Sequence, residues 1–133
     1  MNRRVMDGAL FTAGDYLGGA LLGGMTAAAV RMAIGPETDM VVAMLAGMGI
    51  GMVLHVVVGL LLTPLLGVFH VMVSGGLIGM YGGMMFAMRD SMQTHAMTLH
   101  HVIAVGVVFG LVMSAAIHLY DHALRGPAAA PRS

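Results

Sequence analysis

The feature that most constrains this chain is a long uncharged stretch: between Asp39 and Arg89 the sequence contains no Asp, Glu, Lys or Arg. A helix needs about 20 residues to cross a hydrocarbon layer of about 30 Å, so this stretch is long enough for two crossings. The whole chain is 59% hydrophobic and 9% charged, against about half and about a quarter in an ordinary soluble domain. We therefore predict an integral membrane protein of the all-α class.

Four apolar stretches have the length of a transmembrane helix. They lie near residues 9–33, 40–62, 65–88 and 98–120. Polar segments around Pro36 and Gln93 bound the outer stretches, whereas the second and third are divided only by Thr63–Pro64. Because proline disfavours helical geometry in the residue before it, we expect a tight turn there. The sequence thus predicts one transmembrane domain over residues 1–133, with a flexible tail at 126–133.

The arginines indicate how four such helices are oriented. An even number of crossings places both termini on the same side. Four arginines share that side and two lie on the other: Arg3, Arg4, Arg125 and Arg132, against Arg31 and Arg89. Because positive side chains are enriched on the cytoplasmic side of a membrane, we expect a bacterial inner-membrane protein with both termini cytoplasmic.

Charge and motif content exclude several functions. Six arginines balance six acidic residues, so there is no net field to attract nucleic acid. The chain has no cysteine, which removes disulfides, thiolate metal sites and cysteine nucleophiles. It contains no nucleotide-binding loop, no G-x-S-x-G elbow and no H-E-x-x-H helix. We therefore do not expect an enzyme or a nucleic-acid partner.

Glycines recur at four-residue spacing in every expected span. The sets are Gly14 and Gly18, Gly19 and Gly23, Gly47 and Gly51, Gly75 with Gly79 and Gly83, and Gly106 and Gly110. Small residues one turn apart let membrane helices approach closely. An offset of 59 residues aligns Gly47 and Gly51 with Gly106 and Gly110. Either the chain contains two duplicated helical hairpins, or the similarity arises by chance among glycine-rich helices.

Methionines repeat at the same spacing, and a histidine accompanies each row. One row is Met40, Met44, Met48 and Met52 with His55, and the other is Met80, Met84 and Met88 with His70. At about 100° per residue, each row forms a slowly turning ridge on its helix. An antiparallel hairpin turning at Thr63–Pro64 would bring Met40 level with Met88, Met44 with Met84, and Met48 with Met80. We therefore expect two facing thioether ladders that end in imidazoles.

A ladder of thioethers has a chemical use. Soft sulfur suits Cu(I), and imidazole also suits copper. Thioethers bind without losing protons, so a soft cation can pass along them without new charge being buried. The Met-x-x-x-Met spacing resembles the methionine pair in a membrane helix of the eukaryotic high-affinity copper transporters, which have three helices per chain where four are expected here. Methionine also fills irregular gaps in cores, and the sequence leaves both roles open.

The polar run before the last span contains a second group of soft and borderline ligands. Its members are Met92, His95, Met97, His100 and His101. A cluster of this kind can capture a metal ion at the membrane surface, or it can be a solvated interfacial loop. Only Asp90 nearby offers carboxylate oxygen, so a hard-cation site is not indicated.

Three further polar residues fall within or near the expected spans. Asp15 either lies within the membrane or, if the first span starts later, lies at the interface beside Tyr16. An intramembrane carboxylate is costly unless it is paired, protonated or near water, and its possible partners are His55, His70 and His118. Histidines 118 and 122 stand one turn apart. They either form a metal-binding pair or face the dipole at the helix C-terminus.

Three functions fit these patterns. The first is a membrane protein that transports or delivers Cu(I) through the methionine and histidine residues. The second is a non-catalytic subunit of a larger membrane complex, or a homo-oligomer, packed through its glycines. The third is electron transfer by haem b held between His55 and His70, or between one of these and His118.

Overall fold

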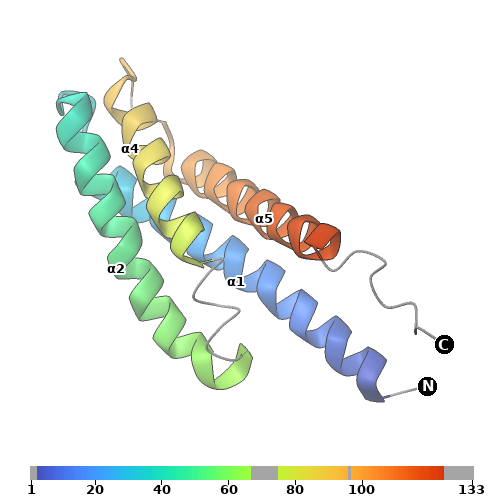
Figure 1. Ribbon diagram of the computed structural model, residues 1–133. Coiled ribbons are helices and arrows are strands. Elements are labelled where there is room, and N and C mark those ends of the chain that lie inside the picture. Colours follow the sequence, from blue (N-terminus) through green and yellow to red (C-terminus); the bar gives the residue numbers. More distant parts are fainter. Residues whose placement is uncertain (1–2, 67–74, 96, 125–133) are drawn as a thin grey trace.

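The protein is all-α, with four helices, as the sequence predicts. The computed structural model describes residues 3–66, 75–95 and 97–124 (Figure 1). The elements are α1 (Arg3–Ala33), α2 (Met40–Leu66), the π-helix η1 (Ile78–Gly82), α4 (Gly83–Ser91) and α5 (Leu99–Leu124). The element η1 continues directly into α4. The expected tail at 126–133 lies outside the described residues.

The prediction of a tight turn at Thr63–Pro64 is wrong. Helix α2 continues to Leu66 and contains Pro64 in its last turn. Proline removes one backbone donor, which so near the helix end costs only the bond to the Leu60 carbonyl. In apolar surroundings a chain keeps its backbone groups paired by staying helical, and proline is tolerated there. The expected third span, 65–88, is corrected accordingly: residues 65 and 66 belong to α2, and its described helical part runs from residue 75 to 91.

Two of the helices are long and apolar enough to cross a membrane. They are Met40–Leu62 within α2 and Leu99–Leu124, the whole of α5, among the residues that the structure describes. The surface is also apolar: 29 large hydrophobic side chains are exposed, whereas ten hydrophobic residues are buried in the described part of the chain. Exposed examples are Leu17 on α1, Leu60 on α2 and Leu119 on α5. Large apolar side chains therefore cover much of the exterior of the described bundle.

Helix α2 begins where the sequence provides a cap. The segment after α1 turns through Gly35, whose carbonyl accepts a bond from the Thr38 amide at 3.1 Å. The Asp39 carboxylate then accepts bonds from the amides of Val41 and Val42, at 2.9 and 3.2 Å. This is the usual way in which an aspartate satisfies the free amides of a helix start. The cap fixes the start of the methionine row at Met40.

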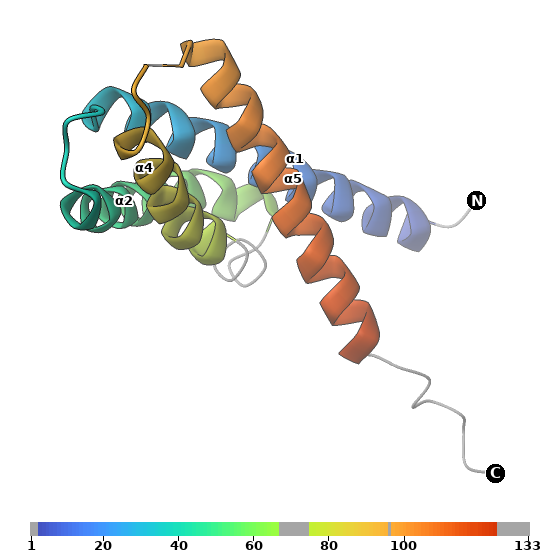
Figure 2. The same cartoon turned by 90° about the horizontal axis from the view of Figure 1, so that it is seen from above.

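Helices α1 and α5 cross where glycine faces glycine. A Cβ atom on Gly23 would collide with the carbonyl oxygen of Gly106, and one on Gly106 would collide with the carbonyl of Gly23. One turn away, a Cβ atom on Gly110 would likewise collide with the carbonyl oxygen of Gly19. Figure 2 shows the two helices crossing at this seam and diverging toward their terminal ends. Only residues without a side chain allow this approach.

Helix α2 meets η1 and α4 in a second seam of the same kind. Gly47 lies against the carbonyl of Gly83, and Gly51 lies against that of Gly79. Both contacts are reciprocal, because a Cβ atom on Gly83 would collide with the carbonyl of Gly47, and one on Gly79 would collide with that of Gly51. Glycines, and not the methionine rows, form the line of contact between these helices.

The two seams correspond in detail. Gly106 faces the methyl group of Ala27, and Gly47 faces that of Ala87. The two glycines, Gly47 and Gly106, are 59 positions apart in the chain, and the two alanines, Ala27 and Ala87, are 60 positions apart. The start of α1 and the end of α5 lie at one end of the bundle, and the α1–α2 and α4–α5 connections lie at the other (Figure 1). We call these the terminal end and the connection end.

Candidate functional site

Five methionines line a groove on one side of the bundle. Its walls come from α2, from η1 and α4, and from α5, and its volume is about 490 Å³. The lining residues are Met44, Leu77, Tyr81, Met84, Met85, Met88, Phe109 and Met113. We call this the methionine groove. From Leu77 to Met88 it follows eleven residues of helix, or about 16 Å at about 1.5 Å per residue.

The structure divides the expected methionine ladders into two sets. Met44, Met84 and Met88 are half-buried in the groove. Met40, Met52 and Met80 are exposed on the outer surface, and Met48 is half-buried without lining the groove. A four-residue repeat turns by about 40° per step on a helix, so the ends of the α2 row rotate away from the centre.

Two groove methionines, Met85 and Met113, were not among the predicted site residues. Met85 directly follows Met84 and so breaks the four-residue spacing, and Met113 lies on α5, which has no methionine row. Both reach the groove because α5 packs beside α4, where Phe109 contacts Phe86. A sequence signal for Met113 would have required knowing which face of α5 meets α4.

The predicted surface cluster lies at the connection end. Met92, His95, Met97, His100 and His101 are all exposed. The loop is held by bonds to its backbone and sulfur: Arg31 Nε donates to the Met97 carbonyl at 3.5 Å, and Gln93 Nε2 donates to the Met97 sulfur at 3.4 Å. Met92 follows Met88 by about one helical turn, so the loop starts next to the Met88 end of the methionine groove.

The Asp15 carboxylate has a partner. His118 Nε2 on α5 lies 3.4 Å from Asp15 Oδ2 on α1. His118 was one of the three expected partners. Tyr16 stacks on the His118 ring, with centroids 5.4 Å apart and planes 12° from parallel. The Ser114 hydroxyl donates to the Asp15 backbone carbonyl at 3.4 Å. His122 is exposed one turn further along α5, so the structure joins His118 to α1 and not to His122.

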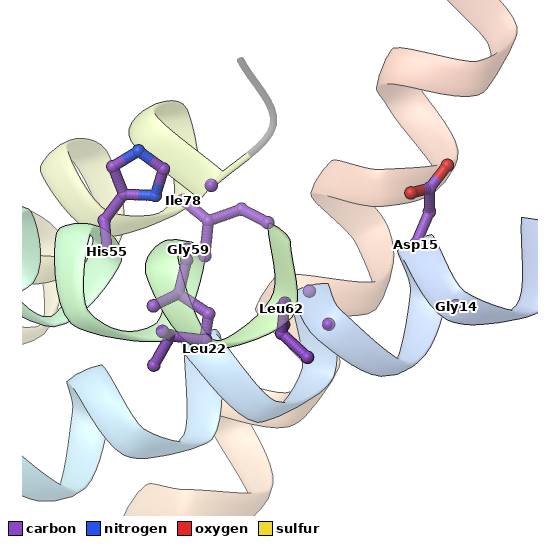
Figure 3. A pocket seen from close by; sticks show the side chains of 11 residues that line it. Gly14, Asp15, Leu22, His55, Gly59, Leu62 and Ile78 are labelled. Carbon is purple, nitrogen blue, oxygen red and sulfur yellow. The ribbon is translucent and has the colours of Figure 1, made fainter. Parts of the chain in front are cut away.

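His55 lies on the other seam at the same end of the bundle. Its ring lies against Gly75, where a Cβ atom would collide with Nδ1. That nitrogen is buried and has no hydrogen-bond partner among the residues that the structure describes. A cavity of about 20 Å³ between α1, α2 and residues 75–78 is lined by both His55 and Asp15. Figure 3 shows the two side chains at opposite ends of it, with the Asp15 carboxylate directed toward α5. His70, the other expected partner, lies outside the described residues.

A metal site made of histidine and carboxylate is not formed in the described part of the chain, where no group of three or more such side chains is close enough to hold an ion. Any metal held there would have to use methionine sulfur as well. Comparison with protein-family models, with curated proteins and with solved structures finds no match to this chain.

Proposed function

We propose that this chain is a small multi-pass membrane protein that transports or delivers Cu(I), with the ion as its cargo. The observation that carries the proposal is the convergence of five thioethers in one groove. Neutral sulfur ligands suit Cu(I), and a copper ion held by them gives a site with only a single positive charge. The groove offers Met84 and Met88 from one wall and Met44 and Met113 from the two others.

A membrane location is supported by the surface. In water, large exposed apolar patches cause association, whereas in lipid they are the ordinary exterior of a helical bundle. The glycine seams add to this, because lipid gives helices no hydrophobic reason to pair and close backbone contact supplies the attraction. We propose four spans, with α1 and the segment ending in α4 crossing beside α2 and α5.

The same seams favour a duplicated helical hairpin over chance similarity. Exchanging α1 with α4 and α2 with α5 converts the Gly23–Gly106 contact into the Gly83–Gly47 contact. Both halves run in the same direction, so the relating axis lies along the membrane normal, as in transporters built from parallel repeats. A second apolar groove of about 300 Å³ lies between α1 and α5 at the equivalent positions, which include Leu17, Leu21 and Met25. The methionines are therefore concentrated in one of two similar grooves.

The route for the ion follows from the position of the loop. The surface cluster, from Met92 to His101, lies next to the Met88 end of the groove and supplies ligands for capture. From there the thioethers lead past Met84 toward Met113, in the direction of the terminal end. With both termini cytoplasmic, this direction is inward from the outer face of a bacterial inner membrane.

The proposal is tested by metal content. The protein is purified in detergent after growth with copper and measured by mass spectrometry of the metal. The test variant carries leucine at four groove positions: Met44, Met84, Met88 and Met113. The matched control carries leucine at four exposed positions: Met32, Met40, Met52 and Met80. Methionine and leucine have similar volumes, so both variants should fold.

Copper near one ion per chain in the native protein and in the control, and none in the groove variant, is the expected result. Copper in neither the native protein nor the control would overturn the proposal. Equal copper in all three would move the site away from the groove.

A second function, as a non-catalytic subunit of a membrane complex, is favoured by the breadth of the same groove. Its apolar walls and open side can seat a helix of another chain, or of a second copy. The test is copurification in a preparation without copper. A partner that copurifies stoichiometrically with the native protein but not with the groove variant would support this second function over copper transport.

Haem b between two histidines stays a prediction. Of its expected ligands, His118 is directed at Asp15 and His55 is packed against Gly75 on the other seam. A haem site that uses His118 would therefore require this residue to leave Asp15, whereas the pair of His55 and His70 is not tested, because His70 lies outside the described residues. An absorption spectrum of the purified protein checks this directly.

A further inference from the structure

The apolar groove between α1 and α5 runs along the exterior of helix α1, and we call it the α1 groove. Its residues on α1 are Leu17, Ala20, Leu21, Gly24, Met25 and Ala28. From Leu17 to Ala28 it follows eleven residues of helix, or about 16 Å at about 1.5 Å per residue. The hydrocarbon layer of a membrane is about 30 Å thick, so the groove has the length of one leaflet.

The floor of the α1 groove is bare where the methionine groove is filled. Gly24 and Ala28 stand 60 positions before Met84 and Met88 in the chain, which line the methionine groove. A Cβ atom on Gly24 would lie 3.1 Å from a methyl group of Val107 on the opposite wall. The floor is therefore the line where α1 meets α5, and a chain of methylene groups can lie there without displacing a large side chain.

At the connection end, the α1 groove leads to an arginine without an acidic partner. Arg31 follows Ala28 by about one turn on the same face of α1. Its Nε donates to the carbonyl of Met97 at 3.5 Å, so the side chain reaches toward the segment that leads into α5. Arg89 is paired with Asp90 at 3.2 Å, whereas Arg31 makes no ion pair within the described part of the chain.

The other charges at this end leave the positive charge of Arg31 uncompensated. Asp39 caps the start of α2, and Glu37 is exposed in the connection after α1. Helix α5 begins at Leu99, two residues after the carbonyl that Arg31 contacts, and the start of a helix is the positive end of its dipole. This end of the α1 groove therefore favours an anionic group.

We propose that the α1 groove binds one anionic phospholipid, with an acyl chain along α1 and the phosphate on Arg31. A guanidinium group can hold a phosphate through two parallel N–H···O bonds, and basic pockets between membrane helices suit anionic headgroups. The amine of a zwitterionic lipid would offset the negative charge that Arg31 attracts. The proposal rests on the membrane location proposed above, and it does not require copper.

Native mass spectrometry tests the site. The protein is placed without copper in nanodiscs of equal parts phosphatidylglycerol and phosphatidylcholine, and the lipids that stay bound after release are identified. Arg31→Gln removes the charge at the groove, and its matched control, Arg4→Gln, removes a charge near the start of α1. Ala28→Met puts into the floor the residue found at the equivalent place in the methionine groove. Its control, Ala13→Met, changes an exposed position of the same helix.

The native protein and both controls should retain one phosphatidylglycerol per chain in preference to phosphatidylcholine. Arg31→Gln should lower this retention by about fivefold, the effect of one arginine near an anionic membrane surface, and Ala28→Met should abolish it. Equal retention of the two lipids by the native protein, or equal losses in Arg31→Gln and Arg4→Gln, would overturn the proposal. A chain that does not enter nanodiscs would overturn the membrane location, and this proposal with it.

If Ala28→Met does not fold, photo-crosslinking of the native protein decides. A phosphatidylglycerol with a diazirine at the end of one acyl chain is irradiated with the protein in nanodiscs. The label should attach to α1 near Leu17, at the end of the groove away from Arg31. Labelling confined to other helices would overturn the proposal.

Discussion

Phe86 and Phe109 pack edge to face, with ring centroids 5.4 Å apart and planes 75° from parallel. Phe86 is fully buried on α4, and Phe109 reaches from α5 into the methionine groove. The contact therefore joins the helix of one seam to the helix of the other. Edge-to-face pairs of this geometry contribute beyond the area that they bury.

Replacement of Phe86 by alanine should strongly destabilise the bundle. Truncating a fully buried phenylalanine costs about 3–5 kcal/mol, because packing is lost and a cavity is left. The measurement is denaturant unfolding in detergent, followed by circular dichroism. Leu119→Ala is the control, since Leu119 is 70% exposed and should change the free energy of unfolding by less than about 0.5 kcal/mol. A similar loss in both variants would mean that the two seams are not joined at Phe86.

Alanine at Gly51 should separate the helices of its seam. The added Cβ atom would overlap the carbonyl oxygen of Gly79, and moving the backbone away costs about 1–3 kcal/mol. Gly49→Ala on the same helix meets no atom within 4 Å and should raise stability by up to about 1 kcal/mol through helix propensity. The thermal midpoints of the two variants should therefore move in opposite directions, and a shared direction would contradict the seam.

Reporter fusions should place both termini in the cytoplasm. A fluorescent protein after Ser133 should fluoresce, and alkaline phosphatase at the same place should be inactive. The opposite pattern is expected for an insertion after Gln93, in the loop between α4 and α5. Activity of alkaline phosphatase at the C-terminus would reverse the proposed direction of metal movement, while like results at both positions would reject four spans.

Two methionines one turn apart should differ in their effect on Cu(I) affinity. Met84 lines the groove, whereas Met80 is 39% exposed on the outer surface. Met84→Leu should weaken Cu(I) binding by at least about tenfold, because even the loss of a residue that only supports a metal ligand lowers metal affinity by about that factor. Met80→Leu should leave the affinity unchanged. Competition with a colorimetric Cu(I) chelator measures both. Equal affinities in the two variants would argue that methionine acts only as packing.

The sequence predicts helix positions well wherever a polar segment marks an end. It places the end of α1 at residue 33 and the start of α2 at Met40, as observed, because Gly35, Pro36 and the Asp39 cap break the apolar pattern. It fails at Pro64, where Thr63 is the only polar neighbour and no charged residue is near, and the helix continues through the proline. Proline alone is a weak stop signal where nothing else can satisfy the backbone.

The register and the site were harder to predict. Glycine spacing correctly indicates close packing, but the observed pairing of Gly47 with Gly83 is displaced by two residues from the expected pairing of Met48 with Met80. Backbone contact fixes the register, and the methionines take the positions left beside it. Which methionines share a groove depends on the place and the angle at which α5 crosses the other helices. Neither the methionine spacing nor the composition of the sequence predicts that angle.

The glycine seams have a consequence for what holds the bundle together. In each close pair, the place where a Cβ atom would stand is occupied by a second Hα, and that hydrogen is directed at the carbonyl oxygen of the opposite glycine. Such Cα–H···O bonds are worth about 0.5–1 kcal/mol each. Their donors and acceptors belong to the main chain. The bundle is therefore held at its two crossings by groups that every residue possesses, and what these positions require is the absence of a side chain.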